Sequence, residues 1–184
     1  MIFPSLPDDA SVRHAFRLNP AAGKLLSEYH QLILRGPSPL SVADRELIAA
    51  YVSGLNRCNF CHGTHLAAAE LFGVSGDLVR TLVADCQLAA APEELRPLLA
   101  YARKLTLDHN RIVAEDAQKV FDAGWSERAL HDLILVAATF NFMNRFVHGH
   151  GIEGNDALHA ERGRYLFESG YAGVAEASPD PERP

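Results

Sequence analysis

The chain has 184 residues, 48% of them hydrophobic and 22% charged, and a formal net charge of -6 at pH 7. Its length suits one domain with one core, and no apolar run approaches the roughly 20 residues that a membrane-spanning helix needs. The acidic balance leaves no surplus of Lys and Arg to neutralise phosphates, so we expect neither a membrane nor a nucleic-acid partner.

The cellular compartment and the use of cysteine are read together. The first residues, MIFPSLPDDASVRH, lack the basic start, apolar stretch and cleavage site of an export signal, so we expect a cytoplasmic protein. Three cysteines in such a compartment argue against a disulfide framework, and a close pair is more often catalytic or metal-binding. The third, Cys86, is expected to be a small buried hydrophobe.

Helical periodicity recurs along the whole chain, and no run shows the period-two alternation of a strand. The sequence therefore predicts an all-α fold of about seven or eight helices. The first strong helix begins after Asn19 and ends before Gly36. The next begins at Ser41, which forms a capping-box pattern with Asp44, and runs to about Leu55.

The remaining helices follow in order. A helix through the cysteine segment is expected to end at Gly73, and a last one to follow Asn155. Between them, four stretches predict helices: SGDLVRTLVAD, APEELRPLLAYARKLTLD, VAEDAQKVFDAG and SERALHDLILVAATFNFMNRFVHG. Residues 1–175 are expected to form the single domain, and the proline-rich tail 176–184 to be disordered.

An internal similarity appears when the chain is shifted by 85 positions. Residues 41–65 then lie over residues 126–150, and Asn56 matches Asn141. Cys58 and Cys61 have no counterpart, because Met143 and Phe146 stand there in the second segment. Either the two segments are a degenerate repeat, or two capped amphipathic helices align by chance. On the first interpretation a CxxC half of about 20–100 is followed by a scaffold half of about 110–170.

The stretch CNFCHGTH carries the most distinctive chemistry. Helical offsets of three, four and seven residues place Cys58, Cys61 and His65 on one face. Cys58 falls in the first turn, where free N–H groups and the helix dipole favour a thiolate. An imidazole one turn beyond Cys61 can take the proton of that thiol or stabilise its anion.

A third group is expected to orient the imidazole. Glu46 lies on the preceding helix, in a stripe of small residues that allows close packing between helices. Its carboxylate is thus a candidate for a proton relay. The alternative is an ordinary solvated glutamate on a helix face.

Other chemistries fit the same segment. Cys58, Cys61 and His62 spell the haem-attachment pattern, which needs export from the cytoplasm. Cys58, Cys61 and His65 supply three zinc ligands, and a structural site needs a fourth, from Glu46, His148 or His150. A thioredoxin-like oxidoreductase is disfavoured because no βαβ pattern precedes the cysteines. A helical interaction protein with inert cysteines stays open.

The spacing Glu46-x11-Cys58-x2-Cys61-x3-His65 resembles the active-site signature of the AhpD-like alkyl hydroperoxidases in the carboxymuconolactone decarboxylase superfamily. The resemblance covers about residues 20 to 100, and the stretch FNFMNRFVHGHGI resembles the uncharacterised peroxidase-related branch. It implies an AhpD-like helical bundle, a homo-oligomer, and a peroxidase that needs no cofactor or metal. In such an enzyme Cys61 attacks the hydroperoxide, Cys58 resolves the sulfenic acid, and a dihydrolipoyl or other dithiol donor restores the pair.

One departure from the family pattern concerns the histidines. The resemblance predicts a histidine immediately before the second cysteine, where this chain has Phe60, and a histidine stands instead at His62. The proton relay, the substrate or the reductant is therefore expected to differ. If the second half folds over the first, polar residues of the long helix would also line the site, namely Asn141, Asn144 and Arg145.

Overall fold

Helices make up the fold in a computed structural model that describes residues 2–7, 9–84 and 88–173. Nine α-helices and no strand occur in these ranges, which confirms the predicted all-α class. The α-helices are α1 (Val12–Arg17), α2 (Pro20–Arg35), α3 (Val42–Leu55), α4 (Asn59–Leu71), α5 (Gly76–Ala84), α6 (Arg96–Leu107), α7 (Ala114–Asp122), α8 (Glu127–Gly149) and α9 (Asp156–Ser169). Three 3₁₀ turns link them: η1 (Leu88–Ala90), η2 (Glu93–Leu95) and η3 (His109–Arg111).

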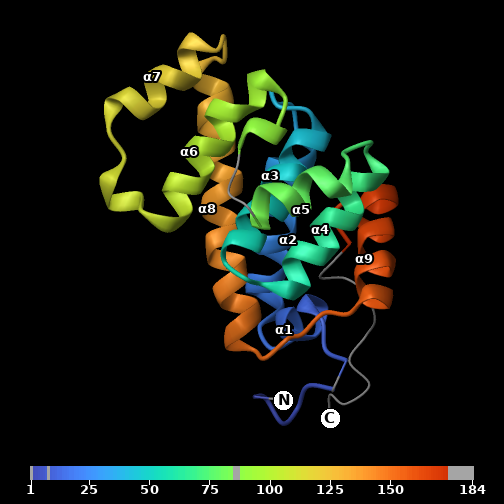
Figure 1. The fold of residues 1–184 in the computed structure, drawn as a ribbon. Helices are drawn as coiled ribbons and strands as arrows, with labels where there is room; N and C mark the ends of the chain where they lie inside the picture. The colour runs from blue at the N-terminus through green and yellow to red at the C-terminus, as the bar shows by residue number, and fades with distance from the viewer. Residues whose placement is uncertain (1, 8, 85–87, 174–184) are drawn as a thin grey trace.

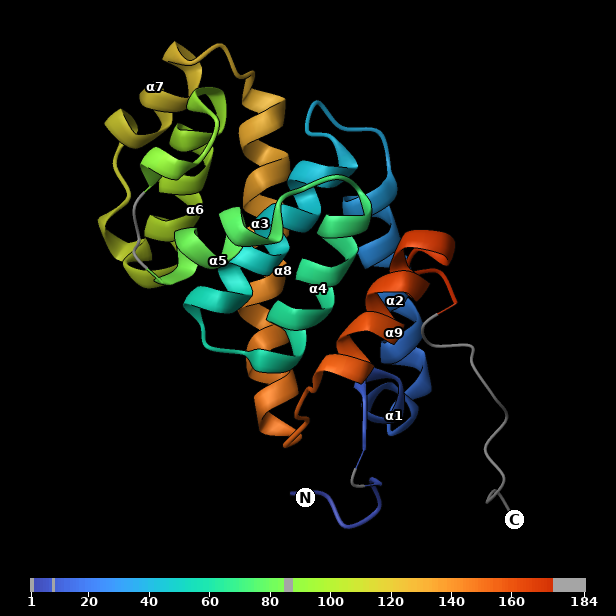
Figure 2. The same cartoon turned by 45° about the vertical axis from the view of Figure 1, so that its right-hand side comes forward.

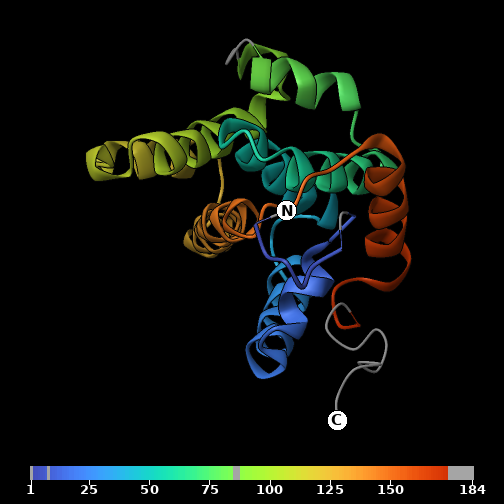
Figure 3. The ribbon, with the colours of Figure 1, turned by 90° about the horizontal axis from the view of Figure 1, so that it is seen from below.

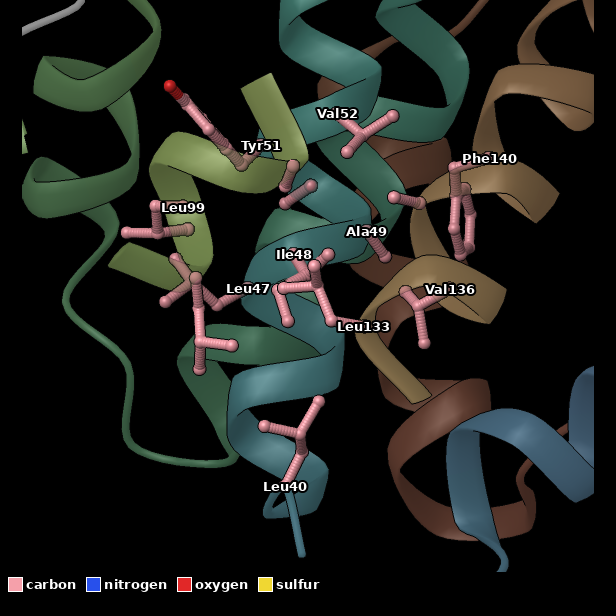
Figure 4. Close-up of a cluster of buried hydrophobic side chains, with 14 of the residues drawn as sticks. Leu40, Leu47, Ile48, Ala49, Tyr51, Val52, Leu99, Leu133, Val136 and Phe140 are labelled. Atoms are coloured by element: carbon pink, nitrogen blue, oxygen red, sulfur yellow. The ribbon is translucent and has the colours of Figure 1, made fainter. Parts of the chain in front are cut away.

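Helix α3 occupies the centre of the molecule (Figure 1). All of residues 45–53 are buried, as expected for a helix that is apolar on every side. Its side chains pack against α6 and α8, as Leu99, Leu133 and Phe140 show in Figure 4. A polar residue on α3 therefore lies in the core and needs a partner there.

The helix ends were largely predicted from capping residues. Asn19 caps α2, Ser41 forms a capping box with Asp44 at α3, and Asn155 caps α9. The sequence did not reveal α1, which has only six residues. Its N-cap backbone N–H, at Ser11, donates to His14 Nδ1 at 3.0 Å, a role that a Glu or Gln fills in the usual motif.

The two segments of the internal similarity fold differently. Residues 42–71 form two helices, α3 and α4, separated by a turn in which Arg57 has a φ of 56°. The second segment is the single continuous helix α8 (Figure 2). Asn56 and Asn141 nevertheless meet, with Nδ2 of Asn56 donating to Oδ1 of Asn141 at 3.1 Å.

Helices α1, α4 and α9 gather on the side of the molecule away from α6 and α7 (Figure 3). A glycine allows α9 to approach α4 closely, since a Cβ at Gly163 would lie 2.6 Å from the Cβ of Ala67. A smaller apolar cluster at this end encloses both cysteines, with Leu6, Val147 and Ile152 among its members.

Three further expectations from the sequence concern membrane spanning, Cys86 and residues 176–184. None of the helices in the described ranges is both long and apolar enough to cross a membrane. The predicted burial of Cys86 and the predicted disorder of residues 176–184 both concern positions outside the described residues.

Candidate active site

Glu46 lies fully buried on α3, with none of its surface exposed. Its Oε1 forms an ion pair with Arg35 Nη1 at 2.7 Å and accepts a hydrogen bond from the Tyr171 hydroxyl at 2.8 Å. Its Oε2 lies 2.8 Å from Nδ1 of His65. The structure thus contradicts the alternative of a solvated glutamate and places Glu46 beside the predicted imidazole.

The surroundings of Glu46 favour its ionised form. Burial alone would raise the pKa of the carboxyl group, because it removes the anion from water. The charge and hydrogen bond of His65, the charge of Arg35 and the Tyr171 hydroxyl outweigh burial, so the pKa is lowered from its ordinary value of 4.5. Glu46 therefore serves as a fixed negative charge.

His65, on α4, is oriented by this carboxylate. Because a carboxylate accepts hydrogen bonds, the proton of the neutral ring belongs on Nδ1, which leaves Nε2 as the proton acceptor. The ring packs edge-on against Phe140, with centroids 4.4 Å apart, and lies parallel to Tyr171 at 6.2 Å. These contacts hold the imidazole in one orientation.

Two partners of Glu46 were not predicted. Arg35 ends α2 and also donates from Nη2 to the carbonyl of Leu166 on α9 at 3.0 Å, and no local signal in the sequence connects it with the site. Tyr171 follows α9 through Gly170, whose φ of 65° suits a glycine. Burial and the Glu46 charge raise the pKa of the Tyr171 hydroxyl well above its ordinary value, so it acts as a donor.

The cysteines lie at the start of α4, both reduced. Cys58 is the N-cap residue, one position before the first turn in which it was expected. Only 1% of Cys58 and 3% of Cys61 is exposed. Within α4, Cys61 is the third residue, so its backbone N–H is one of the free donors that face an N-cap side chain.

The thiols differ in acidity. The neighbouring Cys61 thiol, together with the Cys61 backbone N–H and Asn144, lowers the pKa of Cys58 against the opposing effect of burial. The pKa of Cys61 is raised well above its ordinary value. The causes are its hydrogen bond with the Cys58 thiol, its burial and the charge of Cys58. Among the described residues, the Cys58 side chain accepts no capping hydrogen bond. Of the two thiols, Cys58 is thus the more acidic.

Among the residues considered for the second half, Asn144 reaches the cysteines. It is fully buried, interacts with both sulfurs, donates to Ser53 Oγ at 3.0 Å and accepts from Asn56 at 2.9 Å. Asn141 instead bonds Asn56 and Thr106, and the exposed Arg145 bonds Asn141. Of the three polar residues of α8 that were expected to line the site, Asn144 is therefore the one that contacts the cysteines.

The remaining histidines of the motif serve other contacts. His62 Nδ1 lies 2.9 Å from the Ala50 carbonyl and so ties α4 to α3. His150 stacks between Phe3 and Phe146, and His148 is exposed. In the described part of the chain, no group of three or more His, Cys, Asp or Glu side chains is placed to hold a metal ion, so the zinc alternative finds no ligand set there.

Cys61 and His65 line a common cavity, whereas Cys58 lies behind Cys61 and outside its wall. The cavity offers about 80 Å³ to water-sized molecules. It is lined by Ser11, Val12, Arg13, Phe16, Ser27, His30, Phe60, Cys61, Thr64, His65, Phe140, Met143, Arg162, Tyr165, Leu166 and Tyr171. No hydrogen bond joins His65 to either sulfur within the described ranges, so a proton passing between His65 and Cys61 must cross this cavity, where one water molecule can carry it.

The way into the cavity lies between α1 and α9. Twelve of the lining residues are buried, and the four that are half-buried all belong to these two helices: Val12, Arg13, Arg162 and Tyr165. The Arg13 guanidinium lies over the Tyr165 ring, 4.2 Å from its centroid. Solvent and small molecules therefore reach Cys61 past two arginines.

His30 is a cavity residue that the sequence did not indicate. Its Nδ1 donates to the Leu26 carbonyl at 2.6 Å, and its ring stacks on Tyr171 with centroids 5.8 Å apart. Burial lowers the pKa of His30 from 6.5 to about 4, with a further contribution from the His65 charge. His30 is therefore neutral at pH 7.

Comparison with known proteins agrees with this geometry. Residues 20–104, which contain Glu46 and the cysteine segment, match the model of the carboxymuconolactone decarboxylase family. This part of the chain is thus similar to the carboxymuconolactone decarboxylase family. No curated protein matches the chain.

Two solved structures extend the similarity over most of the chain. One is an uncharacterized peroxidase-related protein from Silicibacter sp. TM1040, with 25% identity, a TM-score of 0.75 and coverage of 86% of this chain and 91% of that one. The other is described as an alkylhydroperoxidase AhpD core, an uncharacterized peroxidase-related protein from Ralstonia eutropha JMP134, with 22% identity and a TM-score of 0.73. It covers 87% of this chain and 92% of its own. The AhpD-like helical fold predicted from the sequence is thus confirmed.

Proposed function

We propose that this protein is a thiol-dependent peroxidase that reduces hydroperoxides through a redox cycle of Cys58 and Cys61. The observation that carries the proposal is the position of Cys61. Cys61 lines a cavity together with His65. The Cys58 thiol interacts with Cys61, and the buried Glu46 carboxylate lies 2.8 Å from Nδ1 of His65. The peroxidase-related names of the similar structures support the same class of reaction.

The first half of the cycle consumes the hydroperoxide. The Cys61 proton leaves to Cys58 or, through a cavity water, to Nε2 of His65. The Cys61 thiolate attacks the distal peroxide oxygen, the O–O bond breaks, and the alkoxide takes up the proton to leave as an alcohol. Cys61 is then a sulfenic acid. A hydroperoxide is thereby reduced by two electrons, which the sulfur supplies.

The second half regenerates the thiols. The Cys58 thiolate attacks the Cys61 sulfur, hydroxide leaves and is protonated to water, and a disulfide joins the two cysteines. An external dithiol then reduces this disulfide by exchange and is itself oxidised. The lowered pKa of Cys58 favours its role as the resolving thiol, because a lower pKa makes the attacking thiolate easier to form.

Glu46 and His65 manage protons in this scheme. The carboxylate fixes Nδ1 of His65 as the protonated nitrogen and stabilises the imidazolium that forms when Nε2 accepts a proton. Phe60, which stands where the family pattern has a histidine, contributes an apolar ring to the cavity wall. Phe60 cannot carry a proton, so His65 is the histidine proposed for the relay. A dihydrolipoyl or other dithiol donor, a homo-oligomeric state and a cytoplasmic location complete the proposal.

Replacing Cys61 with Ser tests the assignment. Consumption of hydrogen peroxide and of an organic hydroperoxide by C61S, with a dithiol present, should fall at least about a hundredfold. The far-ultraviolet circular dichroism should stay unchanged. C86S, which removes the third thiol, is the matched control and should retain turnover. Equal activity of C61S and the wild type would refute the assignment and favour an inactive interaction protein.

A further inference from the structure

The entrance of the cavity carries two guanidinium groups that lack full partners. Nη2 of Arg13, on α1, and Nε of Arg162, on α9, are buried atoms without a hydrogen-bond acceptor. Both residues line the cavity. Buried polar atoms in native proteins nearly always have partners, so donors left free on two facing helices indicate a ligand that accepts from both.

The charge at this entrance is positive despite the acidic chain. The two guanidinium groups lie close enough that the Arg162 charge, after burial, lowers the pKa of Arg13. The acid beside them is the exposed Glu161, whose Oε1 lies 3.5 Å from Nη2 of Arg162. One carboxylate against two guanidinium groups leaves a net positive charge where solvent enters. Such a pair of forks suits a carboxylate, which can accept two hydrogen bonds from one guanidinium.

The inner end of the cavity offers uncharged hydroxyl groups. Thr64, one turn after Cys61, has a buried Oγ1 without a partner, and so does Ser27. Thr106 and Thr139 show the usual alternative for a helical threonine, because each donates to the carbonyl four residues earlier, at 2.8 Å and 2.7 Å. The Thr64 hydroxyl makes no such bond and is free for an oxygen atom of a ligand beside Cys61.

The walls between these ends are apolar. Phe16, Phe140, Met143 and Leu166 form them, and the space is several times that needed for one water molecule. Hydrogen peroxide alone needs neither apolar walls nor a positive entrance. A short hydrocarbon chain with an anionic group at its outer end fits both.

We infer that the substrate of this site is a hydroperoxide of an organic carboxylate. Arg13 and Arg162 hold its carboxylate at the entrance, the apolar walls hold its carbon chain, and the peroxide group lies beside Cys61 and Thr64. This inference rests on the proposed peroxidase function for its chemistry. The carboxylate site itself rests only on the unpartnered donors and the cavity that they line.

A binding experiment tests the carboxylate site without any turnover. Hexanoate and its uncharged amide, hexanamide, are titrated into the reduced protein by calorimetry. Hexanoate should bind at least about tenfold more tightly, since hydrogen bonds to a charged group contribute about 1.5–3 kcal/mol. R162Q and, independently, R13Q should each remove this preference. R164Q is the matched control, because Arg164 lies exposed on the same helix and pairs with Glu168.

A kinetic experiment tests the link to catalysis. The ratio of kcat/KM for 6-hydroperoxyhexanoate to that for its methyl ester should exceed about ten in the wild type and in R164Q, and should approach one in R162Q. Equal binding of hexanoate and hexanamide, or equal effects of R162Q and R164Q, overturns the inference. Arginine-dependent hexanoate binding in a protein that turns over no hydroperoxide supports the carboxylate site and refutes the peroxidase function instead.

Discussion

At the scale of single residues, the buried charges around Glu46 are the feature with the largest energetic consequence. One carboxylate forms an ion pair with the Arg35 guanidinium and accepts hydrogen bonds from the Tyr171 hydroxyl and the His65 imidazole, so none of these polar groups is left without a partner. Removing one member of a buried ion pair is costly because the other stays charged in a medium of low polarity. Glu46, Arg35, Tyr171 and His65 therefore also hold α2, α3, α4 and the end of the described chain together.

Replacing Glu46 with Gln should lower the free energy of unfolding by about 3–5 kcal/mol, because Arg35 loses its buried counter-charge. It should also slow peroxide reduction about a hundredfold by removing the group that orients His65. Tyr171→Phe removes a single hydroxyl donor and should cost only about 1–2 kcal/mol. Urea unfolding of both variants measures the difference, and a smaller loss for E46Q than for Y171F would contradict the importance of the ion pair.

His30 makes stability depend on pH. Its pKa is lower in the folded protein, about 4, than the ordinary value of 6.5. A histidine of this kind stabilises the fold fully at pH values above 6.5, and the contribution is lost as the pH falls from 6.5 towards 4. The difference between the two pKa values corresponds to at most about 3 kcal/mol. Glu46, whose folded pKa is also lowered, stabilises the fold fully above pH 4.5 and loses this contribution as the pH falls below 4.5.

H30F should remove most of this pH dependence. Unfolding free energies measured at pH 7, 6, 5 and 4.5 should fall more steeply for the wild type than for H30F, because a phenyl ring cannot take up a proton. H148Q, altered at an exposed histidine, should follow the wild type. The charged groups facing His30 are His65 and Glu46, and both are kept in these variants. Parallel curves for H30F and the wild type would show that His30 is not buried as a neutral group.

The sequence predicted the residues of the site that are close along the chain. Cys61 and His65 lie one turn apart on α4, Cys58 is the N-cap residue of that helix, and Glu46 lies on the preceding helix, so local spacing was sufficient to propose them as a group. Tyr171 is separated from His65 by 106 positions, and His30 and Arg35 lie on a different helix. No spacing rule connects them with the cysteines, because their approach depends on how distant helices pack.

At the scale of helices, the contact between α4 and α9 decides the shape of the site. Gly163 lies at this contact, where an added Cβ would meet the Ala67 Cβ at 2.6 Å and the Ala68 nitrogen at 2.9 Å. Both distances are shorter than those found for real Cβ contacts. One neighbouring atom is a backbone nitrogen and the other is the Cβ of an alanine, so neither can move aside by rotating a side chain. The approach of α9 also brings Arg162 and Tyr165 to the cavity, so the entrance depends on this glycine.

G163A should therefore lower the free energy of unfolding by about 1–3 kcal/mol, since α9 must move outward to make room. Gly149, on α8, has open space around its Cα, and G149A should leave stability unchanged or raise it by up to about 1 kcal/mol. Thermal or urea unfolding compares the two. If G163A were as stable as G149A, the close approach of the two helices would be disproved.

Most helices could be predicted because their apolar faces and capping residues are local signals. The exceptions have physical reasons. A six-residue helix such as α1 is held by its packing rather than by its own sequence. The separation of α3 from α4 depends on Arg57, whose φ is positive. A positive φ is usually predicted from a glycine, and the sequence has an arginine at this position. That α8 continues unbroken through the matching position could not be read from the shared Asn.

At the scale of the whole molecule, the fold brings two ends of the chain over one pair of cysteines. The N-terminal stretch and α1 cover one side, and α9 with Tyr171 covers the other. The site is thus shielded from bulk water. Its entrance carries two guanidinium groups, whereas the chain as a whole has a formal net charge of -6 at pH 7. The homo-oligomer expected from the sequence stays a prediction, which sedimentation velocity can test.

The redox cycle of the two cysteines is tested most directly by mass spectrometry of the fully reduced protein after one equivalent of hydrogen peroxide. The account predicts the loss of two thiols and a tryptic peptide pair that carries a Cys58–Cys61 disulfide. C58S should instead stop at a sulfenic acid on Cys61, which dimedone traps. Intact thiols at Cys58 and Cys61, or oxidation confined to Cys86, would contradict the account.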